Sequence, residues 1–412
     1  MLAAVDRAHF YRSSGNTVWW AASEPRLEMF GVPGTAPAAL GYQVFRPDFD
    51  RVLVESAESA GADVRTPARV RSVAFGGESA VVDYEHHGRQ STIAGRFVLD
   101  CSGRVGVVGR RLRCAQPGHR MVALVGVWQG HSWDLPEETH TVVETYEDGW
   151  AWSVPISSTA RHVGVMVGQG QNYQAEIEKT VHLRRALGAA TLQHEWACDA
   201  SLYFAERYAG PQFLLVGDAG SFIDPLSSFG VKKALASAWL AAIVAHTTLT
   251  HPERESMALD FFSHWERHVY ATHLRWSRDF ARAACAGHPS AFWSARAETE
   301  VDAPDTDEAD VTAGEVRFAA SSEFDLTLAA GVRFEPRPVI RGREIVLEEA
   351  FAGGLRFVGH VDLVTLAEMA CHHRRVPDLF DAYCRSCTPA PLPNVVSGLS
   401  MLVAKGILHE RS

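Results

Sequence analysis

The most informative segment of the sequence contains a carboxylate at the end of an apolar strand. In FLLVGDAGSFIDPLSSFGVKK, which begins at residue 213, Asp218 follows Gly217 directly after the apolar run. A loop containing Pro225 comes next, and an Ala-rich stretch predicts a long helix that begins near Gly230. Burying a carboxylate costs free energy unless it is hydrogen-bonded, so Asp218 either caps local structure or accepts a hydrogen bond from a ligand hydroxyl.

A flavin has the groups that this arrangement could bind. Its ribityl chain and pyrophosphate present hydroxyls and phosphates, and its reduced ring carries negative charge that a helix N-terminus stabilises. A glycine in the loop would allow close approach of the backbone to the ring. The loop residues predicted to make this approach are Ser227, Ser228, Phe229, Gly230 and Val231, and Gly217, Asp218 and Pro225 are also predicted to bind the cofactor.

The same segment resembles a family motif. GDAGSFIDPLSSFGVKK is similar to the second flavin motif of group-A FAD monooxygenases, and more narrowly to that of flavin-dependent halogenases and halogenase-like monooxygenases. YQVFRPDFDRVL resembles the family's R-x-x-FD-x-x-L segment, and FVLDCSGRVG resembles its D-x-x-G strand and loop. The resemblance places Arg46, Asp100 and Gly103 at the cofactor. The three matches occur in the family's order, across residues 42–250.

A fourth match concerns two tryptophans. GWAWSVPI is similar to the W-x-W-x-I-P signature of flavin-dependent halogenases, with Val154 where isoleucine is usual. The resemblance places Trp150 and Trp152 between the flavin and the substrate cavity. The alternative is that two aromatic side chains at positions i and i+2 line one face of a strand and fill a core.

The sequence departs from the family pattern in two places. Halogenases of this type carry a lysine in their N-terminal half that captures hypohalous acid, whereas no lysine precedes Lys179 here. Lys232 and Lys233 lie just past the predicted helix start and are poor candidates for that role. The sequence also has no G-x-G-x-x-G motif of the kind that binds ADP pyrophosphate. We therefore expect a chain that is N-terminally short relative to the family.

The order of the predicted elements indicates an α/β protein. Residues 1–41 are expected to be irregular, and a helix with Pro47 in its first turn follows. Alternating apolar and polar residues predict strands from about 69 to 100, and further strands over about 120–170 form a substrate β-sheet layer. With the resemblance, this order predicts a FAD-binding three-layer α/β fold that is N-terminally incomplete.

Three regions are predicted along the chain. Residues 1–286 form the FAD-binding and substrate domain, and the acidic segment in 287–314 is a linker. Residues 315–412 form a small α+β domain whose last helix and turn resemble winged-helix modules. Cys384 and Cys387 in this domain are at helical spacing, which favours a core face over a zinc site. We predict no metal site.

Composition excludes several classes of protein. The chain has 412 residues, 47% of them hydrophobic, and a net charge of −10, which argues against a nucleic-acid partner. No apolar run reaches the roughly 18 residues that a membrane span needs, and no export signal is recognisable at the N-terminus. Seven cysteines without framework spacing fit a reducing compartment, so we expect a cytoplasmic protein.

The resemblance implies a FAD-dependent monooxygenase. In the family mechanism, a flavin C4a-hydroperoxide oxygenates an electron-rich aromatic of indole or phenol type, which is a free small molecule or is bound to a peptide or carrier. The reductant is a reduced flavin or NAD(P)H. Two alternatives are a halogenase of a tryptophan-like substrate, and a truncated, non-catalytic remnant or binding module. The sequence identifies no catalytic base.

Overall fold

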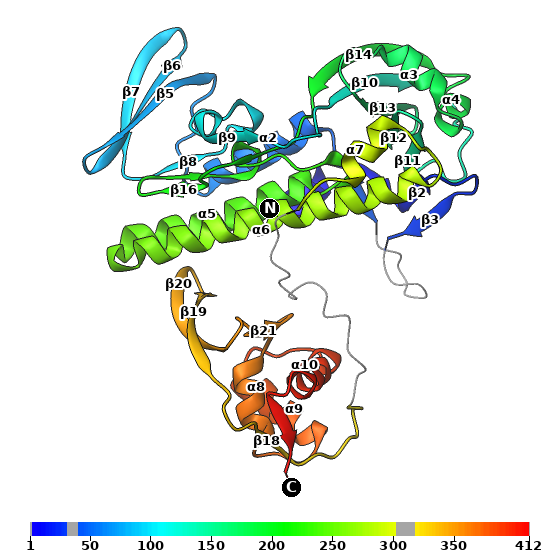
Figure 1. The fold of residues 1–412 in the computed structure, drawn as a ribbon. Helices are drawn as coiled ribbons and strands as arrows, with labels where there is room; N and C mark the ends of the chain where they lie inside the picture. Colours follow the sequence, from blue (N-terminus) through cyan, green and yellow to red (C-terminus); the bar gives the residue numbers. More distant parts are fainter. Residues whose placement is uncertain (1, 31–39, 302–317, 412) are drawn as a thin grey trace. The chain divides into compact units, whose positions relative to one another are not determined.

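The computed structural model describes residues 2–30, 40–301 and 318–411, and these have a mixed α/β architecture (Figure 1). The largest sheet has seven strands in the order β14-β10-β13-β12-β11-β2-β3. All neighbours are antiparallel except β11 and β2, which are parallel. In the order of the sheet, the strands are Thr191–Asp199, Val122–Gln129, Ala160–Val167, Gly149–Pro155, Thr141–Tyr146, Gly15–Trp19 and Arg26–Met29.

Both faces of the inner strands of this sheet are buried, since alternate residues of a strand point to opposite sides and apolar clusters lie on each side. In β10, Ala123 and Val125 belong to one apolar cluster and Leu124 belongs to another. The first cluster includes residues of α6 (Glu255–Cys285) and α7 (Ala291–Ala297). The second includes residues of α3 (Tyr173–Lys179) and α4 (His182–Ala186). The sheet layer predicted over residues 120–170 is confirmed.

A smaller sheet positions the carboxylate segment. Its order is β16-β17-β8, and β17 (Phe213–Leu215) runs parallel to β8 (Val98–Asp100). The predicted helix after residue 45 is α2 (Arg46–Ser59), which begins with a proline in its first turn. The shorter elements of this part of the chain are α1 (Leu2–Arg7), β1 (Tyr11–Ser13), β4 (Gly41–Gln43), β9 (Arg113–Ala115), β15 (Tyr203–Ala205) and β16 (Ala209–Gly210).

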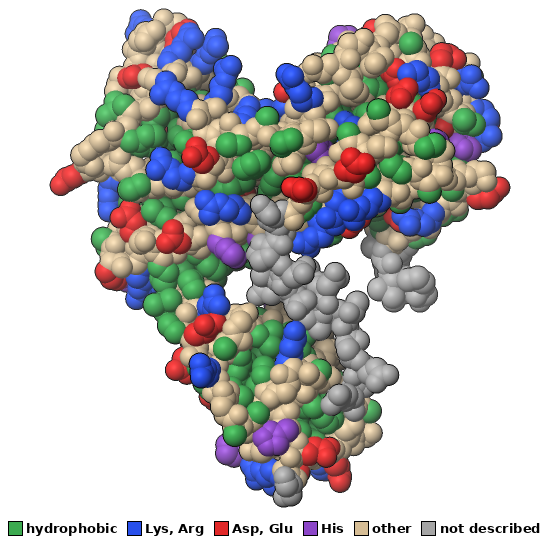
Figure 2. Space-filling model, in the orientation of Figure 1, with side chains coloured by type: hydrophobic (Ala, Val, Ile, Leu, Met, Phe, Trp, Pro, Cys, Tyr) green, Lys and Arg blue, Asp and Glu red, His purple; other side chains and the backbone are tan. Residues whose placement is uncertain are grey.

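A three-stranded antiparallel sheet precedes β8. It consists of β5 (Ala68–Gly76), β6 (Ser79–His86) and β7 (Arg89–Gly95), as the alternating pattern predicted. Basic side chains gather over it on the face shown in Figure 2, and Arg71 pairs with Glu85. β5 is exposed along almost its whole length, so this sheet contributes little to the buried core.

The expectation of irregular structure in residues 1–41 is wrong for part of the described range. β2 lies inside the seven-stranded sheet, where Val18 is opposite Val143 of β11, and Trp19 is 3% exposed. The strand has five residues, and its parallel partner lies more than a hundred residues later in the chain. Local periodicity cannot indicate such a pairing, because the partner that satisfies its hydrogen bonds is remote.

The chain packs as two compact units. One contains residues 1–241 and 262–302, and the other contains 242–261 and 303–412. The end of α5 (Gly230–Thr250) and the start of α6 therefore belong to the second unit. Within that unit, the Ile345 amide donates to Thr247 Oγ1 at 2.9 Å.

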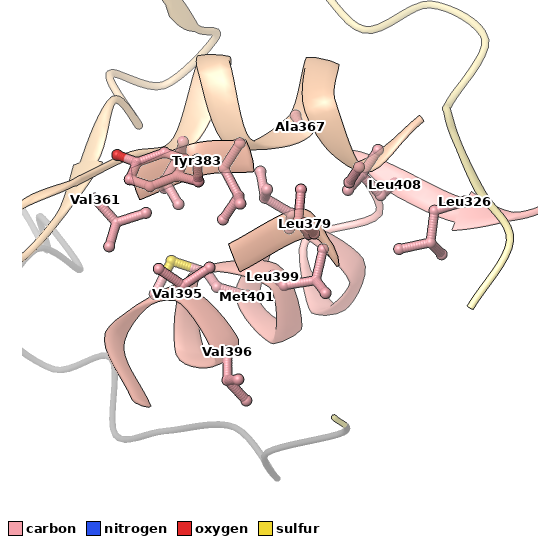
Figure 3. Close-up of a cluster of buried hydrophobic side chains, with 14 of the residues drawn as sticks. Leu326, Val361, Ala367, Leu379, Tyr383, Val395, Val396, Leu399, Met401 and Leu408 are labelled. Carbon is pink, nitrogen blue, oxygen red and sulfur yellow. The ribbon is translucent and has the colours of Figure 1, made fainter. Parts of the chain in front are cut away.

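The second unit has the α+β composition that the sequence predicted, with its own apolar core (Figure 3). Leu379 and Tyr383 of α9 are fully buried in this core, and Cys387 packs against it. The Cys384 thiol lies 3.9 Å from the Ala390 carbonyl oxygen. The elements are β18 (Leu326–Leu328), β19 (Phe334–Arg341), β20 (Glu344–Phe351), β21 (Phe357–Val358), β22 (Val361–Asp362), α8 (Leu363–Ala370), α9 (Val376–Ser386), α10 (Leu392–Ala404) and β23 (Leu408–Glu410).

The predicted linker 287–314 contains ordered structure at its start. Residues 291–297 form α7, and Trp293 is 2% exposed in the core of the first unit, so this part is not a linker. Most of the acidic stretch lies outside the described residues. None of the helices in the described parts of the chain is long and apolar enough to span a membrane.

Candidate functional site

The buried strand β17 delivers Asp218 to a cavity at its carboxyl end. All three residues of the strand are buried, and Gly217 follows with φ of +59°, a conformation that strains residues with a side chain. The chain then turns through Asp218 and reaches a one-turn helix at Pro225–Ser227 before α5 begins at Gly230. The strand, turn and helix predicted around the carboxylate are therefore present.

We call the cavity of about 530 Å³ at this point the strand-end cavity. It brings together eight of the eleven residues that the sequence predicted for the cofactor: Arg46, Gly103, Gly217, Asp218, Pro225, Ser228, Gly230 and Val231. Sequence reasoning missed the other lining residues, which are Phe49, Asp50, Leu53, Cys101, Val216, Phe222, Ile223, Ala234, Leu235 and Ala238. The apolar residues of α2 and α5 among them could have been found from their helical spacing to the predicted ones.

Two glycines leave open space at this cavity. A Cβ atom added to Gly103 or to Gly230 would meet no atom within 4 Å, and both residues line the cavity. Gly230 is also the first residue of the 21-residue helix α5, whose first amides have no partner within the helix. The cavity therefore offers a helix start, uncrowded glycines and a carboxylate, which fit the hydroxyls and the electron-rich ring edge of a flavin.

The Asp218 carboxylate is partly shielded from solvent. Its side chain is 32% exposed, and burial raises its pKa. Positive charges on Lys233, Arg104 and Arg46 oppose this shift, in decreasing order. Arg46 itself pairs with Asp50 of the same helix, with Nε 3.0 Å from Oδ1. The three cations favour an ionised carboxylate that can accept a hydrogen bond from a ligand hydroxyl.

Asp100 does not line the cavity. Its buried carboxylate accepts hydrogen bonds from the amides of Ser102 (3.0 Å), Val108 (2.7 Å) and Gly109 (3.0 Å). These bonds fold the loop after β8 so that Gly103 reaches the cavity. The structure thus gives Asp100 a part in shaping the loop, and its predicted contact with the cofactor stays a prediction.

A second cavity of about 740 Å³ lies on the other side of the 225–229 turn, and we call it the aromatic cavity. Ser227 and Phe229, predicted for the cofactor, line this cavity and not the strand-end cavity, whereas Ser228 lines both. The remaining lining residues are Asn16, Val18, Trp20, Arg26, Glu28, Thr141, Val143, Leu226, Trp276, Asp279, Phe280 and Ala283. The turn is therefore the wall shared by two chambers.

Asp224 stabilises the turn that forms this wall. No role was predicted for it from the sequence. Its side chain is 5% exposed, one oxygen accepts from the Leu226 amide at 3.0 Å, and the other accepts from Ser277 of α6 at 2.5 Å. An Asp directly before a Pro at a helical turn is an N-cap pattern, so the first contact could have been found from the sequence. The contact with Ser277 could not.

The tryptophan pair lies on β12 and packs ring to ring. The centroids of Trp150 and Trp152 are 5.2 Å apart, and Trp150 is 4% exposed in the apolar cluster that α6 and α7 share. Neither residue lines the strand-end or the aromatic cavity among the residues that define them. The alternative of a core-filling pair fits this position, and a substrate-cavity role stays a prediction.

Trp152 is held against the backbone of the neighbouring strand, which leads to a testable prediction. A Cβ on Gly164 would lie 2.1–2.4 Å from the Trp152 indole, so Gly164→Ala must displace the ring. We expect this variant to lose about 1–3 kcal/mol of unfolding free energy, with an altered near-ultraviolet circular dichroism spectrum. Gly168→Ala is the matched control, because its Cβ would meet nothing within 4 Å. Equal stability of the two variants would contradict the packing described.

The sequence of this chain is similar to those of known proteins. Residues 21–326 match the family model of tryptophan halogenases. Tryptophan 2-halogenase of Chondromyces crocatus is 30% identical over 260 residues, which cover 57% of this chain and 49% of that protein. The chain spans about half the length of the curated relatives that it matches.

Two solved structures share the fold. The flavin-dependent halogenase CmlS has a TM-score of 0.76 at 20% identity, and the match covers all of this chain and 86% of that one. The peptidyl tryptophan dihydroxylase QhpG has a TM-score of 0.62 at 22% identity, and covers 92% of this chain and 82% of that one. The predicted α/β class and the predicted flavin-dependent halogenase superfamily, a superfamily of enzymes, are confirmed. The chain belongs to the tryptophan halogenase family.

Proposed function

We propose that this protein is a FAD-dependent oxidoreductase that inserts oxygen into an electron-rich aromatic substrate of indole or phenol type. The observation that carries this proposal is the position of Ser228, which lines both the strand-end cavity and the aromatic cavity. Two cavities that share a lining residue are neighbours, and atom transfer between a cofactor and a substrate requires their sites to be close together.

The strand-end cavity is the site proposed for FAD. Asp218 would accept a hydrogen bond from a hydroxyl of the cofactor, and the first amides of α5 at Gly230 would face its electron-rich edge. When bound and reduced, the flavin activates molecular oxygen for transfer to an aromatic carbon. Asp224, through its bonds to the turn and to α6, keeps the wall between the chambers rigid.

The aromatic cavity is the site proposed for the substrate. Trp20, Trp276 and Phe280 offer flat apolar faces for a planar ring, and stacked or edge-to-face arrangements would hold it. Arg26, Glu28 and Asp279 also line the cavity, where they could meet polar groups of the substrate, and Arg26 pairs with Glu28 at 2.7 Å. A small molecule or an aromatic group on a peptide or carrier protein fits these requirements, and a reduced flavin or NAD(P)H would supply electrons.

Halogenation of a tryptophan-like substrate is the alternative, and the family relationship supports it. The distribution of lysines favours oxygen insertion. Among the described residues, none of the four lysines lines the aromatic cavity. Lys179 pairs with Glu176 at 2.7 Å, and Lys233 is buried. The fold does not decide the question, because CmlS is named a halogenase and QhpG a dihydroxylase.

The products separate the two activities. We expect purified protein, supplied with reduced FAD, oxygen, bromide and an indole or phenol, to give a product that contains oxygen from isotopically labelled O₂. A product with the isotope doublet of bromine would favour the halogenase. A protein that binds no FAD and consumes no reduced FAD above the rate without protein would favour the non-catalytic alternative.

A further inference from the structure

Lys233 is a buried cation beneath the corner that presents Asp218. Its side chain is 2% exposed, although it lies on the first turn of α5. Its ammonium donates to the Gly217 carbonyl at 2.9 Å and to the Ser221 carbonyl at 2.7 Å. These two carbonyls flank Asp218 in the chain, so the lysine holds both sides of the turn.

Ser237, one helical turn after Lys233, also hydrogen-bonds to Gly217. The Gly217 amide donates to Ser237 Oγ at 2.9 Å, so both backbone polar groups of this glycine bond to side chains of α5. Ser237 also hydrogen-bonds to Glu266 of α6. The corner with φ of +59° at Gly217 is therefore fixed from below by one face of α5.

Two carboxylates act on the lysine. Its Nζ is 3.9 Å from Asp218 Oδ1, and the buried carboxylate of Glu266 on α6 also favours its charged form. Burial lowers the pKa of Lys233, while Glu266 and Asp218 oppose that shift. Burial raises the pKa of both carboxylates, and Lys233 is the strongest opposing charge for each of them. The cation and the two anions therefore stabilise one another in their charged forms.

Other charged and titratable groups act on this cluster. Arg104 and Arg46 face Asp218 from the loop after β8 and from α2. His273 of α6 faces Lys233, and burial lowers the pKa of His273 to about 4, with Lys233 and Lys232 adding to the shift. His273 is therefore neutral near neutral pH. Lys233 is the buried cation that can control the charge of Asp218.

We propose that Lys233 is a positioning residue of the cofactor site, which holds the Gly217–Asp218 corner and supplies the buried positive charge that keeps Asp218 ionised toward the strand-end cavity. Its side chain is 2% exposed and does not line the strand-end cavity, so it acts through the corner and not by touching the cofactor. The inference rests on the proposed FAD site, and it adds the residue on which the protonation state of that site depends.

The sign of the pH effect follows from the charges. Removal of the Lys233 charge raises the pKa of Asp218 further, so the carboxylate takes up its proton at a higher pH. The ionised carboxylate is the stronger acceptor for a ligand hydroxyl. FAD affinity that depends on it is complete above the pKa of Asp218 and is lost as the pH falls through that pKa. In Lys233→Met, this loss occurs at a higher pH than in the unmodified protein.

The test is a series of FAD titrations by flavin fluorescence at closely spaced pH values. For Lys233→Met we expect affinity about tenfold weaker near neutral pH, in line with the loss of one charged contact, and recovery toward alkaline pH. Lys233→Arg, which keeps the charge, should restore the shape of the profile. Lys232→Met is the matched control on the preceding, exposed residue, and its profile should coincide with that of the unmodified protein.

Two results would overturn the inference while FAD binding itself stands: a profile for Lys233→Met identical to the unmodified one, or weakening by the same factor at every pH. Failure of the unmodified protein to bind FAD would instead overturn the proposed function. Should Lys233→Met not fold, Lys233→Gln tests the same charge, because its amide can still donate to a carbonyl oxygen while it carries no charge. The loss of affinity should again move to higher pH, and an unmoved profile would count against the inference.

Discussion

Asp218→Ala is expected to weaken FAD binding about tenfold to a hundredfold, since a hydrogen bond to a charged group contributes roughly 1.5–3 kcal/mol. The carboxylate lines the strand-end cavity and remains 32% exposed toward it. The substitution also leaves Lys233 with one carboxylate neighbour in place of two. This disfavours the buried cation that holds the corner, so FAD binding should weaken further. Equilibrium titration of FAD, followed by quenching of its fluorescence, measures the effect.

Two further variants distinguish the effect of the Asp218 charge from effects that any carboxylate substitution could have. Asp218→Asn keeps the shape of the side chain and removes the charge, so we expect an affinity between those of Asp218→Ala and the unmodified protein. Asp134→Asn changes an exposed carboxylate that pairs with Arg185 at 2.8 Å and lines neither cavity, and it should leave affinity unchanged. If Asp218→Ala bound FAD as tightly as the control, the cofactor site would have to lie elsewhere.

The parts of this site that sequence predicts are those with local causes. The apolar strand, Gly217 with its positive φ, and the helix that begins at Gly230 follow one another within eighteen residues, and each has a residue preference that is visible without a fold. The predicted residues around Asp218 therefore gather at one cavity. Asp100 was correctly placed at a strand end, but its carboxylate bonds to its own loop.

The parts that sequence does not predict depend on contacts between remote segments. The sequence placed Lys233 just past a helix start without indicating its burial, which comes from the packing of α5 against the turn. The bond between Asp224 and Ser277 joins a loop to a helix some fifty residues later. The aromatic cavity on one side of the turn is lined in part by β2, and β2 is in place because it pairs with a strand that is remote in the sequence. Periodicity describes one element at a time, so it cannot supply such relationships.

Trp293→Ala is expected to destabilise the first unit by about 3–5 kcal/mol, the usual cost of removing a large buried aromatic side chain. Trp293 is 2% exposed and packs with Trp20 and Phe292, with ring centroids 5.7 and 5.0 Å away. Its indole nitrogen donates to the Tyr146 carbonyl at 2.9 Å, and this bond links α7 to the last residue of β11. The residue falls in a segment that composition alone assigned to a linker, so its stability effect tests that correction directly.

The matched control is Trp239→Ala, which removes the same side chain from an exposed position on α5 (59% exposed). We expect the control to change the unfolding free energy by no more than about 0.5 kcal/mol, as is usual for surface positions. Thermal denaturation followed by circular dichroism compares the two, and the midpoint of Trp293→Ala should be lower by roughly 10 °C. Equal midpoints would mean that α7 does not pack on the sheet, and that residues 291–297 behave as the linker that their composition suggested.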